Sequence, residues 1–191
     1  MNKLVCITGL VGAGKSVLSD YFLKNDFKYL RLGQITIDEI LKRGLPVNEA
    51  NERFVREDLR KQHGMAAFAI LNLPKVEELL KEGNVILDGL YSFEEYKVLK
   101  EKFGDDLAVI AVYASPKLRY ERLGNRKVVE GDTNVRNRPL TVEEAKSRDF
   151  SEIENLNKGG TIAMADYTIL NTKDLDFLQA QVEEVFGEIV M

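Results

Sequence analysis

The chain has 191 residues, of which 45% are hydrophobic and 30% charged, and its formal net charge is −4 at pH 7. This length predicts one domain, residues 1–191, whose core is large enough to fold without cross-links. The acidic balance offers no basic face for nucleic acid, the single cysteine excludes a disulfide within the monomer, and no apolar run approaches the ~18 residues that span a bilayer. Since the start of the chain also lacks a signal-peptide pattern, we expect a reducing, cytoplasmic setting.

Short apolar runs alternate with longer amphipathic runs, which is typical of parallel strands covered by helices. In the first half of the chain the pattern predicts strands at about residues 4–8 and 27–32, and helices at about 15–25, 35–43, 48–63 and 65–81. Pro74 lies in the last of these helices and is expected to kink or split it, because proline lacks the N–H that the helix needs.

The second half of the chain continues the same alternation. It predicts strands at about residues 84–88, 107–113 and 167–170, and a closing helix at about 175–186. Ser92 and Thr141 each precede a helical pattern and are followed three residues later by glutamate, which predicts two capping boxes. The five strands together predict an α/β fold, with one doubly wound parallel sheet and helices on both of its faces.

Residues 9–16 match the pattern G-x-x-x-x-G-K-[ST], the Walker A motif or P-loop, between a predicted strand and a predicted helix. The glycines allow positive φ, so that successive N–H groups form an anion-binding nest at the start of the helix. Lys15 is expected to reach the β and γ phosphates of a nucleoside triphosphate, and the Ser16 hydroxyl to bind Mg²⁺. A tight glycine-rich turn with an exposed lysine is the alternative. The residues expected to contact the nucleotide here are Gly9, Val11, Gly12, Ala13, Gly14, Lys15, Ser16 and Val17.

A carboxylate, Asp88, ends the apolar run Val85-Ile86-Leu87. In a doubly wound sheet, ligands bind at the carboxyl ends of the strands, so Asp88 is predicted to lie beside the phosphates. Either it helps to organise Mg²⁺, or it accepts a proton from the molecule that receives the phosphoryl group. The plainer alternative is that it caps the turn after the strand.

The segment at about residues 124–141 is polar, aperiodic and rich in arginine. Such a segment predicts a short lid that brings positive charge over a transferring phosphoryl group and excludes water. Arg122 and Arg126 are expected to close over the bound nucleotide, whereas the alternative is an ordinary solvated loop. Other arginines in or near the segment are Arg119, Arg136, Arg138 and Arg148.

Two arginines in an earlier helical pattern, Arg56 and Arg60, lie four residues apart among acidic neighbours. They form either a salt-bridged solvated face or a site that holds the phosphate of an acceptor molecule, and the pattern does not separate the two. Phe54, Phe68 and Tyr91 are candidates for lining the pocket of that acceptor, although packing in the core explains Phe68 equally well.

Six segments carry a resemblance to a known family: residues 6–16, 59–64, 87–89, 114–123, 148–149 and 165–171. Taken in order, they resemble the nucleoside-monophosphate-kinase-like branch of P-loop proteins. Within that branch they look most like dephospho-coenzyme A kinase and a related group labelled dephospho-CoA-kinase-like or AAA-family ATPases.

The resemblance implies an ATP-dependent phosphotransferase that moves the γ-phosphoryl group of ATP to a small-molecule acceptor. It also implies that the loop at Asn171 faces adenine, and that Lys15 and Asp88 act at the reacting phosphate. The alternative is a regulatory ATPase or nucleotide-sensing switch, which would act on a protein partner and would need no acceptor.

Overall fold

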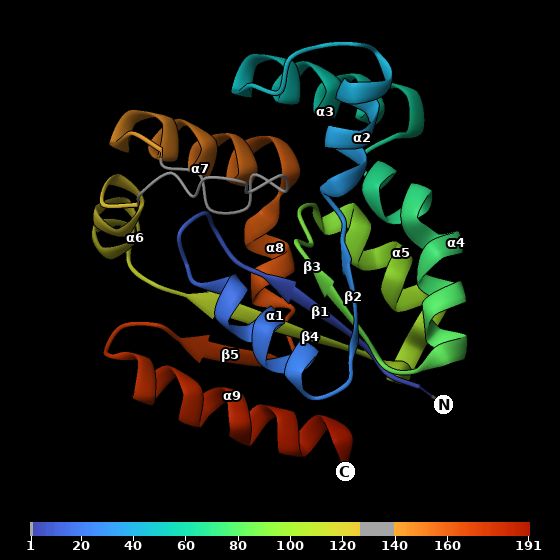
Figure 1. Cartoon of the computed structure of the whole chain (residues 1–191), viewed down its shortest axis with the longest axis vertical. Helices are drawn as coiled ribbons and strands as arrows, with labels where there is room; N and C mark the ends of the chain where they lie inside the picture. Colours follow the sequence, from blue (N-terminus) through green and yellow to red (C-terminus); the bar gives the residue numbers. More distant parts are fainter. Residues whose placement is uncertain (1, 127–139) are drawn as a thin grey trace.

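The centre of the molecule is a five-stranded sheet, seen in a computed structural model that describes residues 2–126 and 140–191 (Figure 1). All neighbouring strands are parallel, and their order across the sheet is β2-β3-β1-β4-β5. The central strand is buried along its whole length, as expected for a continuous apolar run covered on both faces. The strands are β1 (Leu4–Thr8), β2 (Lys28–Arg31), β3 (Val85–Asp88), β4 (Leu107–Tyr113) and β5 (Tyr167–Leu170).

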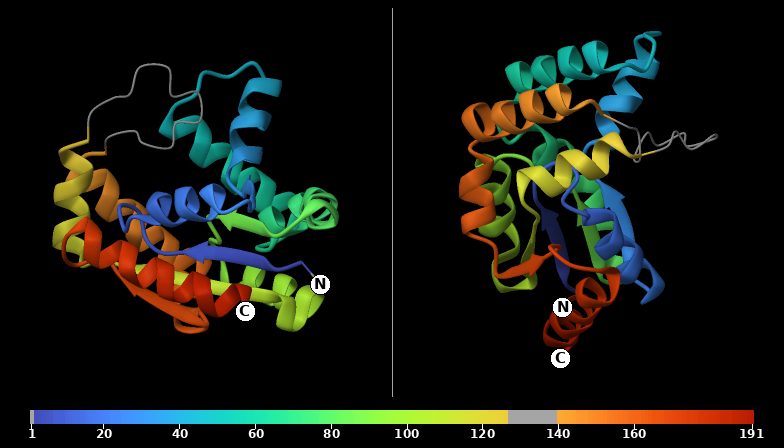
Figure 2. Two further views of the ribbon diagram at one scale, coloured as in Figure 1. Left: turned by 60° about the horizontal axis from the view of Figure 1, so that its bottom comes forward. Right: turned by 90° about the vertical axis from the view of Figure 1, so that its left-hand side faces the viewer.

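Helices cover both faces of this sheet, because successive side chains of each strand point to opposite sides. Leu4 and Cys6 of β1 belong to the core cluster under α4 and α5, whereas Val5 and Ile7 belong to the cluster under α1 and α9 (Figure 2). The helices are α1 (Lys15–Lys24), α2 (Gln34–Lys42), α3 (Glu49–His63), α4 (Ala67–Glu82), α5 (Phe93–Phe103), α6 (Pro116–Gly124), α7 (Val142–Leu156), α8 (Lys158–Ala163) and α9 (Leu175–Val190).

The doubly wound fold predicted from the sequence is confirmed, and so are the two capping boxes at Ser92 and Thr141. Pro74 was predicted to kink or split its helix, and the split is wrong, because α4 is one continuous helix that contains this proline. Pro74 cannot donate to the carbonyl of Ile70, but Ile70 is 43% exposed. Water can therefore satisfy that carbonyl, which reduces the cost of the missing hydrogen bond.

Three helices, α2, α3 and α7, lie beyond the carboxyl ends of the strands (Figures 1 and 2). In both figures α3 and α7 are neighbours, although they belong to opposite halves of the chain. The short helix α8 follows α7 directly and packs against both α7 and α5. The fold therefore places charged helices from distant parts of the sequence above the edge at which P-loop proteins bind ligands.

Candidate functional site

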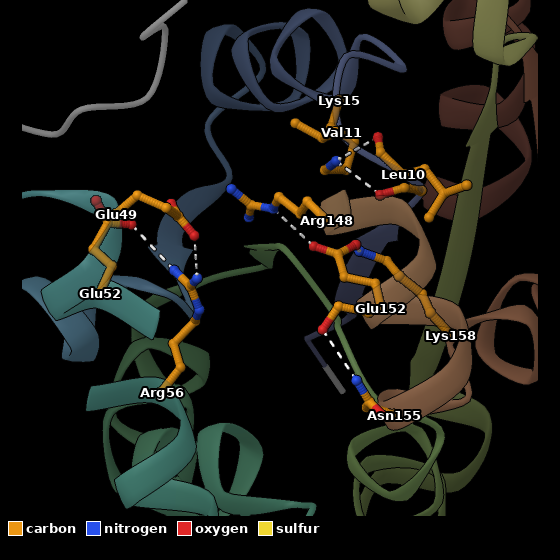
Figure 3. A network of polar contacts seen from close by, with 12 residues as sticks. Leu10, Val11, Lys15, Glu49, Glu52, Arg56, Arg148, Glu152, Asn155 and Lys158 are labelled. Carbon is orange, nitrogen blue, oxygen red and sulfur yellow. Dashed lines mark hydrogen bonds and ion pairs between the residues drawn. The ribbon is translucent and has the colours of Figure 1, made fainter. Parts of the chain in front are cut away.

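The phosphate loop, residues 9–16, connects β1 to α1 and has the curled backbone that its glycines predict. Gly9 and Gly14 have φ angles of 140° and 103°, a region that side chains strongly disfavour. The ammonium group of Lys15 donates to the carbonyl oxygens of Gly9 at 2.8 Å and Leu10 at 3.2 Å (Figure 3). The lysine thus folds back over its own loop.

The surroundings of Lys15 disfavour its charged form. Burial, followed by the nearby ammonium of Lys158, lowers the pKa of Lys15 to about 7, and the carboxylate of Asp88 only partly opposes this effect. Because burial is the main cause of this lowered pKa, a bound anion would stabilise the protonated lysine.

Asp88 is the last residue of β3, directly beside Ile7 of β1, and is 7% exposed. Tyr29 of β2 donates its hydroxyl to Asp88 Oδ2 at 3.0 Å. The carboxylate is therefore held at the carboxyl edge of the sheet, next to the phosphate loop. The sequence indicated this position for Asp88 but did not indicate the contact with Tyr29.

Side chains from the second half of the chain donate hydrogen bonds to backbone carbonyls of the phosphate loop. The Asn171 amide donates to the Ala13 carbonyl at 2.8 Å, and Arg119 donates to the Val11 carbonyl at 2.9 Å. Arg122, expected to close over the nucleotide, donates to the carbonyl of Asn171 at 3.1 Å. The side chain of Asn171, whose loop is expected to face adenine, contacts the phosphate loop through Ala13.

Arg119 also joins α6 to α7. It is 1% exposed and forms an ion pair with Asp149 Oδ2 at 2.6 Å, and the hydroxyl of Tyr120 donates to the same oxygen at 2.9 Å. An arginine that holds both a loop carbonyl and a buried carboxylate fixes the distance between α7 and the phosphate loop.

A buried charged cluster links α7 to α8 (Figure 3). Glu152 accepts from Arg148 Nε at 3.0 Å and from Lys158 Nζ at 2.6 Å, and Lys158 is only 1% exposed. Burial alone would raise the pKa of Glu152, but the two cations hold that pKa well below its usual range. Lys158 also lies 5.0 Å from the centre of the Tyr91 ring. Sequence reasoning missed Glu152 and Lys158, because no helical period relates residues on two separate helices.

A cavity of about 130 Å³, the loop cavity, lies in front of the phosphate loop. It brings together the phosphate loop, the end of β3 and the charged helices. Arg126 lines it too, whereas residues 127–139 of the predicted lid, including Arg136 and Arg138, lie outside the described residues. Its charged and hydroxyl-bearing lining includes Lys15, Ser16, Asp88, Arg56, Arg126 and Arg148.

A second and larger cavity of about 780 Å³, the helix cavity, lies between α3 and α7. Five residues line both cavities, which are therefore adjacent: Arg56, Tyr91, Leu140, Arg148 and Glu152.

Of the three aromatic residues proposed for an acceptor pocket, two line a cavity and one does not. Phe68 and Tyr91 line the loop cavity, and Tyr91 lines the helix cavity as well. Phe54 lines neither cavity, which contradicts the expectation: the residue is 57% exposed, and its ring centre lies 6.0 Å from the guanidinium carbon of Arg43.

Arg56 and Arg60, equivalent in the sequence pattern, differ in the structure. Arg56 pairs with Glu49 at 2.7 Å and with Glu52 at 3.2 Å, which agrees with a salt-bridged helix face (Figure 3). The guanidinium carbon of Arg60 instead lies 4.7 Å from the centre of the Phe68 ring.

These features define a class: a kinase-like P-loop fold, in which a nucleotide-binding loop faces the carboxyl edge of a parallel sheet. A family model described as an AAA domain matches residues 5–149, and the chain belongs to that family. It is 34% identical to a UPF0200 protein of Thermococcus kodakarensis over 98% of both chains. It is 32% identical to a UPF0200 protein of Methanococcus vannielii, over 99% of this chain and 97% of that protein.

Solved structures share the fold at low sequence identity. Shikimate kinase from Bacteroides thetaiotaomicron has a TM-score of 0.60 and 16% identity, with 100% of both chains covered. A gluconokinase from Sinorhizobium meliloti has a TM-score of 0.55 and 13% identity, over 98% of this chain and 97% of that one. The resemblance to P-loop kinase-like proteins is confirmed, but these similarities support that family as a whole rather than dephospho-coenzyme A kinase in particular.

The described part of the chain contains no helix long and apolar enough to span a membrane.

Proposed function

We propose that the protein is an ATP-dependent phosphotransferase that moves the γ-phosphoryl group of ATP to a small-molecule acceptor. The observation that carries this proposal is the pair of adjacent cavities, one at the phosphate loop and one of about 780 Å³ beside it. A kinase must hold an acceptor beside the terminal phosphate, whereas a nucleotide switch needs no room for a second small molecule.

The residues of the loop cavity suit phosphoryl transfer, in which positioning and charge stabilisation supply most of the catalysis. A bound triphosphate would offer Lys15 oxygen partners in place of the carbonyls of Gly9 and Leu10, and would raise its pKa from about 7. Arg126 and Arg148 line the same cavity and would add positive charge near the phosphates. Asp88 would accept the proton of the acceptor hydroxyl or take part in holding the metal.

The residues of the loop cavity also fit Mg²⁺. Ser16 and Asp88 line it together and offer a hydroxyl and a carboxylate, the hard oxygen ligands that this ion prefers. Among residues 2–126 and 140–191 no group of three or more His, Cys, Asp or Glu side chains could hold a metal unaided. The phosphates of the nucleotide would therefore supply further ligands, as is usual for Mg²⁺. When bound, the ion neutralises charge on the phosphates.

The acceptor-side test compares ATP turnover alone with turnover in the presence of hydroxy acids, nucleoside monophosphates and dephospho-coenzyme A. We expect one class to accelerate ADP formation and to yield one phosphorylated acceptor for each ADP. Turnover that is equal with every compound, without any phosphorylated product, would contradict the proposal and favour a regulatory ATPase. Competition by GTP as effective as that by ATP would contradict the adenine preference expected from the resemblance.

A further inference from the structure

Two backbone N–H groups of the phosphate loop, those of Gly12 and Gly14, lack an acceptor among the residues that the structure describes. The N–H between them, that of Ala13, donates instead to the carbonyl of Leu10 at 3.2 Å. Both glycines line the loop cavity, and Gly12 is buried. Because a backbone N–H that is buried without an acceptor is costly, these two donors are suited to a ligand bound in that cavity.

The carbonyl group of each of these two peptide units, which belongs to the residue before the glycine, is held by a side chain. Arg119 donates to the carbonyl of Val11 at 2.9 Å. The amide of Asn171 donates to the carbonyl of Ala13 at 2.8 Å. Both peptide units are trans, so their C=O and N–H bonds point in opposite directions. A side chain that fixes the carbonyl therefore also fixes the direction of the N–H, and directs it away from itself.

The two side chains are themselves held in place, and both lie outside the lining of the loop cavity. Asn171 is 9% exposed, and its own carbonyl accepts from Arg122 at 3.1 Å. Arg119 donates from Nε to the carbonyl of Ala114 at 3.0 Å, in addition to its ion pair with Asp149. Because such contacts already restrict the rotamers of the two side chains, each can hold one orientation of its peptide unit at little further cost in entropy.

The glycines of the motif leave the room that these contacts need. A Cβ at Gly14 would overlap Nδ2 of Asn171, and the φ angle of Gly14 is +103°. A Cβ at Gly12 would lie 3.0 Å from the carbonyl oxygen of Arg119 and from the side chain of Leu123. The spacing of the glycines therefore serves the approach of distant residues as well as the curl of the loop.

We propose that Asn171 is a positioning residue for phosphate binding, which directs the N–H of Gly14 at a phosphate group in the loop cavity. This inference rests on the nucleotide binding that the proposed function requires, but not on phosphoryl transfer. A hydrogen bond to the carbonyl also polarises the N–H of the same peptide unit and makes it a stronger donor. The side chain of Asn171 thus contributes to affinity for the phosphates and not for the base. Arg119 repeats the arrangement at Gly12.

The test compares a ligand that consists of phosphates alone with one that also has a base. Wild type and Asn171→Ala, as full chains with Mg²⁺, are titrated calorimetrically with inorganic tripolyphosphate and with a non-hydrolysable ATP analogue. We expect both affinities to fall by the same factor in the variant, about fivefold or more, because both ligands meet the same misdirected donor. The amide proton of Gly14 should also shift upfield in the NMR spectrum of the ligand-free variant, since its peptide unit is no longer polarised.

Unchanged affinities in Asn171→Ala, which a purely structural role would give, would overturn the proposal. So would a loss for the ATP analogue without a loss for tripolyphosphate, which would place the side chain at the base, or a wild type that does not bind tripolyphosphate. Phosphoryl transfer by wild type together with unchanged binding in Asn171→Ala would refute the positioning role alone. A parallel loss of both affinities in a protein that phosphorylates no acceptor would refute the proposed function and retain the positioning role.

The matched control is Thr172→Ala, because Thr172 is the next residue of the same loop and is exposed. It should bind both ligands like wild type, and equal losses in the two variants would contradict the proposal. If Asn171→Ala does not fold, Asn171→Asp serves, since it keeps the shape of the side chain but replaces the donor by a carboxylate oxygen beside the carbonyl of Ala13. It should weaken the binding of both ligands at least as much.

Discussion

The two cavities are built from the chain in different ways. One wall of the loop cavity is a short segment, residues 9–16, whose backbone conformation follows from glycines at fixed spacings, while the end of β3 and the charged helices complete the lining. The helix cavity depends on side chains of α3 and α7, which are separated in the sequence by residues 64–141. A backbone nest is formed by consecutive residues, so the phosphate loop can be recognised as a sequence motif. The ion pairs of α3 and α7 join residues that are distant in the sequence, so this half of the site can be recognised only from the fold.

The difference also concerns what holds each half in place. The phosphate loop is held by hydrogen bonds to its carbonyls, from Arg119 and Asn171. The charged helices are held by buried ion pairs, above all those of Glu152 with Arg148 and Lys158. We therefore expect substitutions in the buried ion pairs to reduce the stability of the fold, and substitution of the loop side chain Lys15 to reduce ligand binding first.

The largest expected effect on stability is that of Glu152→Gln. Removing this carboxylate leaves Arg148 and Lys158 without their shared anion, and breaking a buried ion pair of this kind costs about 3–5 kcal/mol of unfolding free energy. Urea unfolding measures the change. Glu154→Gln, an exposed position on the same helix, is the control and should differ from wild type by less than about 0.5 kcal/mol.

The effect of Glu152→Gln on the free energy of unfolding should depend on pH. Because the folded-state pKa of Glu152 is depressed, its stabilisation is fully present above its unfolded-state pKa near ~4.3 and is lost as the pH falls toward the folded pKa. The stability difference between wild type and Glu152→Gln should therefore shrink as the pH is lowered below about 5. A difference that stays constant down to about pH 2 would show that Glu152 is not ionised in this cluster.

Lys15→Met tests the role of the phosphate loop in ATP turnover. Loss of the ammonium should lower ATP turnover by about 10²–10³-fold, the usual effect of removing one group that stabilises transition-state charge. The unfolding free energy should not fall, because a cation in surroundings that lower its pKa to about 7 is itself unfavourable. Lys24→Met at the exposed end of the same helix should retain full turnover, and near-normal turnover in Lys15→Met would refute the phosphate-loop assignment.

Gly9→Ala tests how closely the backbone of the phosphate loop packs against β4. A Cβ at Gly9 would lie 2.5 Å from the carbonyl oxygen of Val112 in β4, a backbone atom that cannot move aside easily, and φ is +140°. We expect a loss of about 2–3 kcal/mol in unfolding free energy from strain and overlap. Gly44→Ala is the control, because its φ is also positive but nothing lies within 4 Å of the added methyl group. Equal losses in the two variants would mean that φ alone, not the contact with β4, sets the cost.

The smallest expected effect is the uptake of a proton when the ATP analogue binds. With a pKa of about 7, most Lys15 side chains are neutral at pH 8.5 in the free protein, and bound phosphates would protonate them. Calorimetry of ATP-analogue binding in buffers of different ionisation enthalpy should therefore detect uptake of up to about one proton at pH 8.5. Uptake should decrease toward pH 6, where Lys15 is already protonated. The absence of any uptake at pH 8.5 would indicate that the phosphates do not approach this lysine.

The sequence predicted those features that depend on neighbours along the chain. The alternation of apolar runs predicted the sheet, and the glycine spacing together with Asp88 at a strand end predicted the position of the loop cavity. The cluster around Glu152 was not predictable, because Lys158 follows it across the left-handed residue Asn157 that separates α7 from α8. Which residues approach across such a break depends on the packing of the whole fold.

Arg56 and Arg60 illustrate the same limit within one helix. Four residues apart, they share a helix face and the same acidic surroundings in sequence. Their difference arises from Phe68, which α4 places under Arg60, and from Glu49, which lies within 2.7 Å of Arg56. Asn171 is a similar case, because its sequence position does not indicate that its amide contacts the carbonyl of Ala13.

That contact between Asn171 and Ala13 joins residues 158 positions apart and has a consequence for the order of biosynthesis. A ribosome produces the phosphate loop among the first residues, but it adds Asn171, together with β5, only when about nine-tenths of this sequence is complete. Nascent chains would hold the loop without this brace, and a bound nucleotide would stabilise the finished product more than any shorter intermediate. A chain that ends before residue 171 should therefore bind a nucleotide more weakly than the 191-residue chain does.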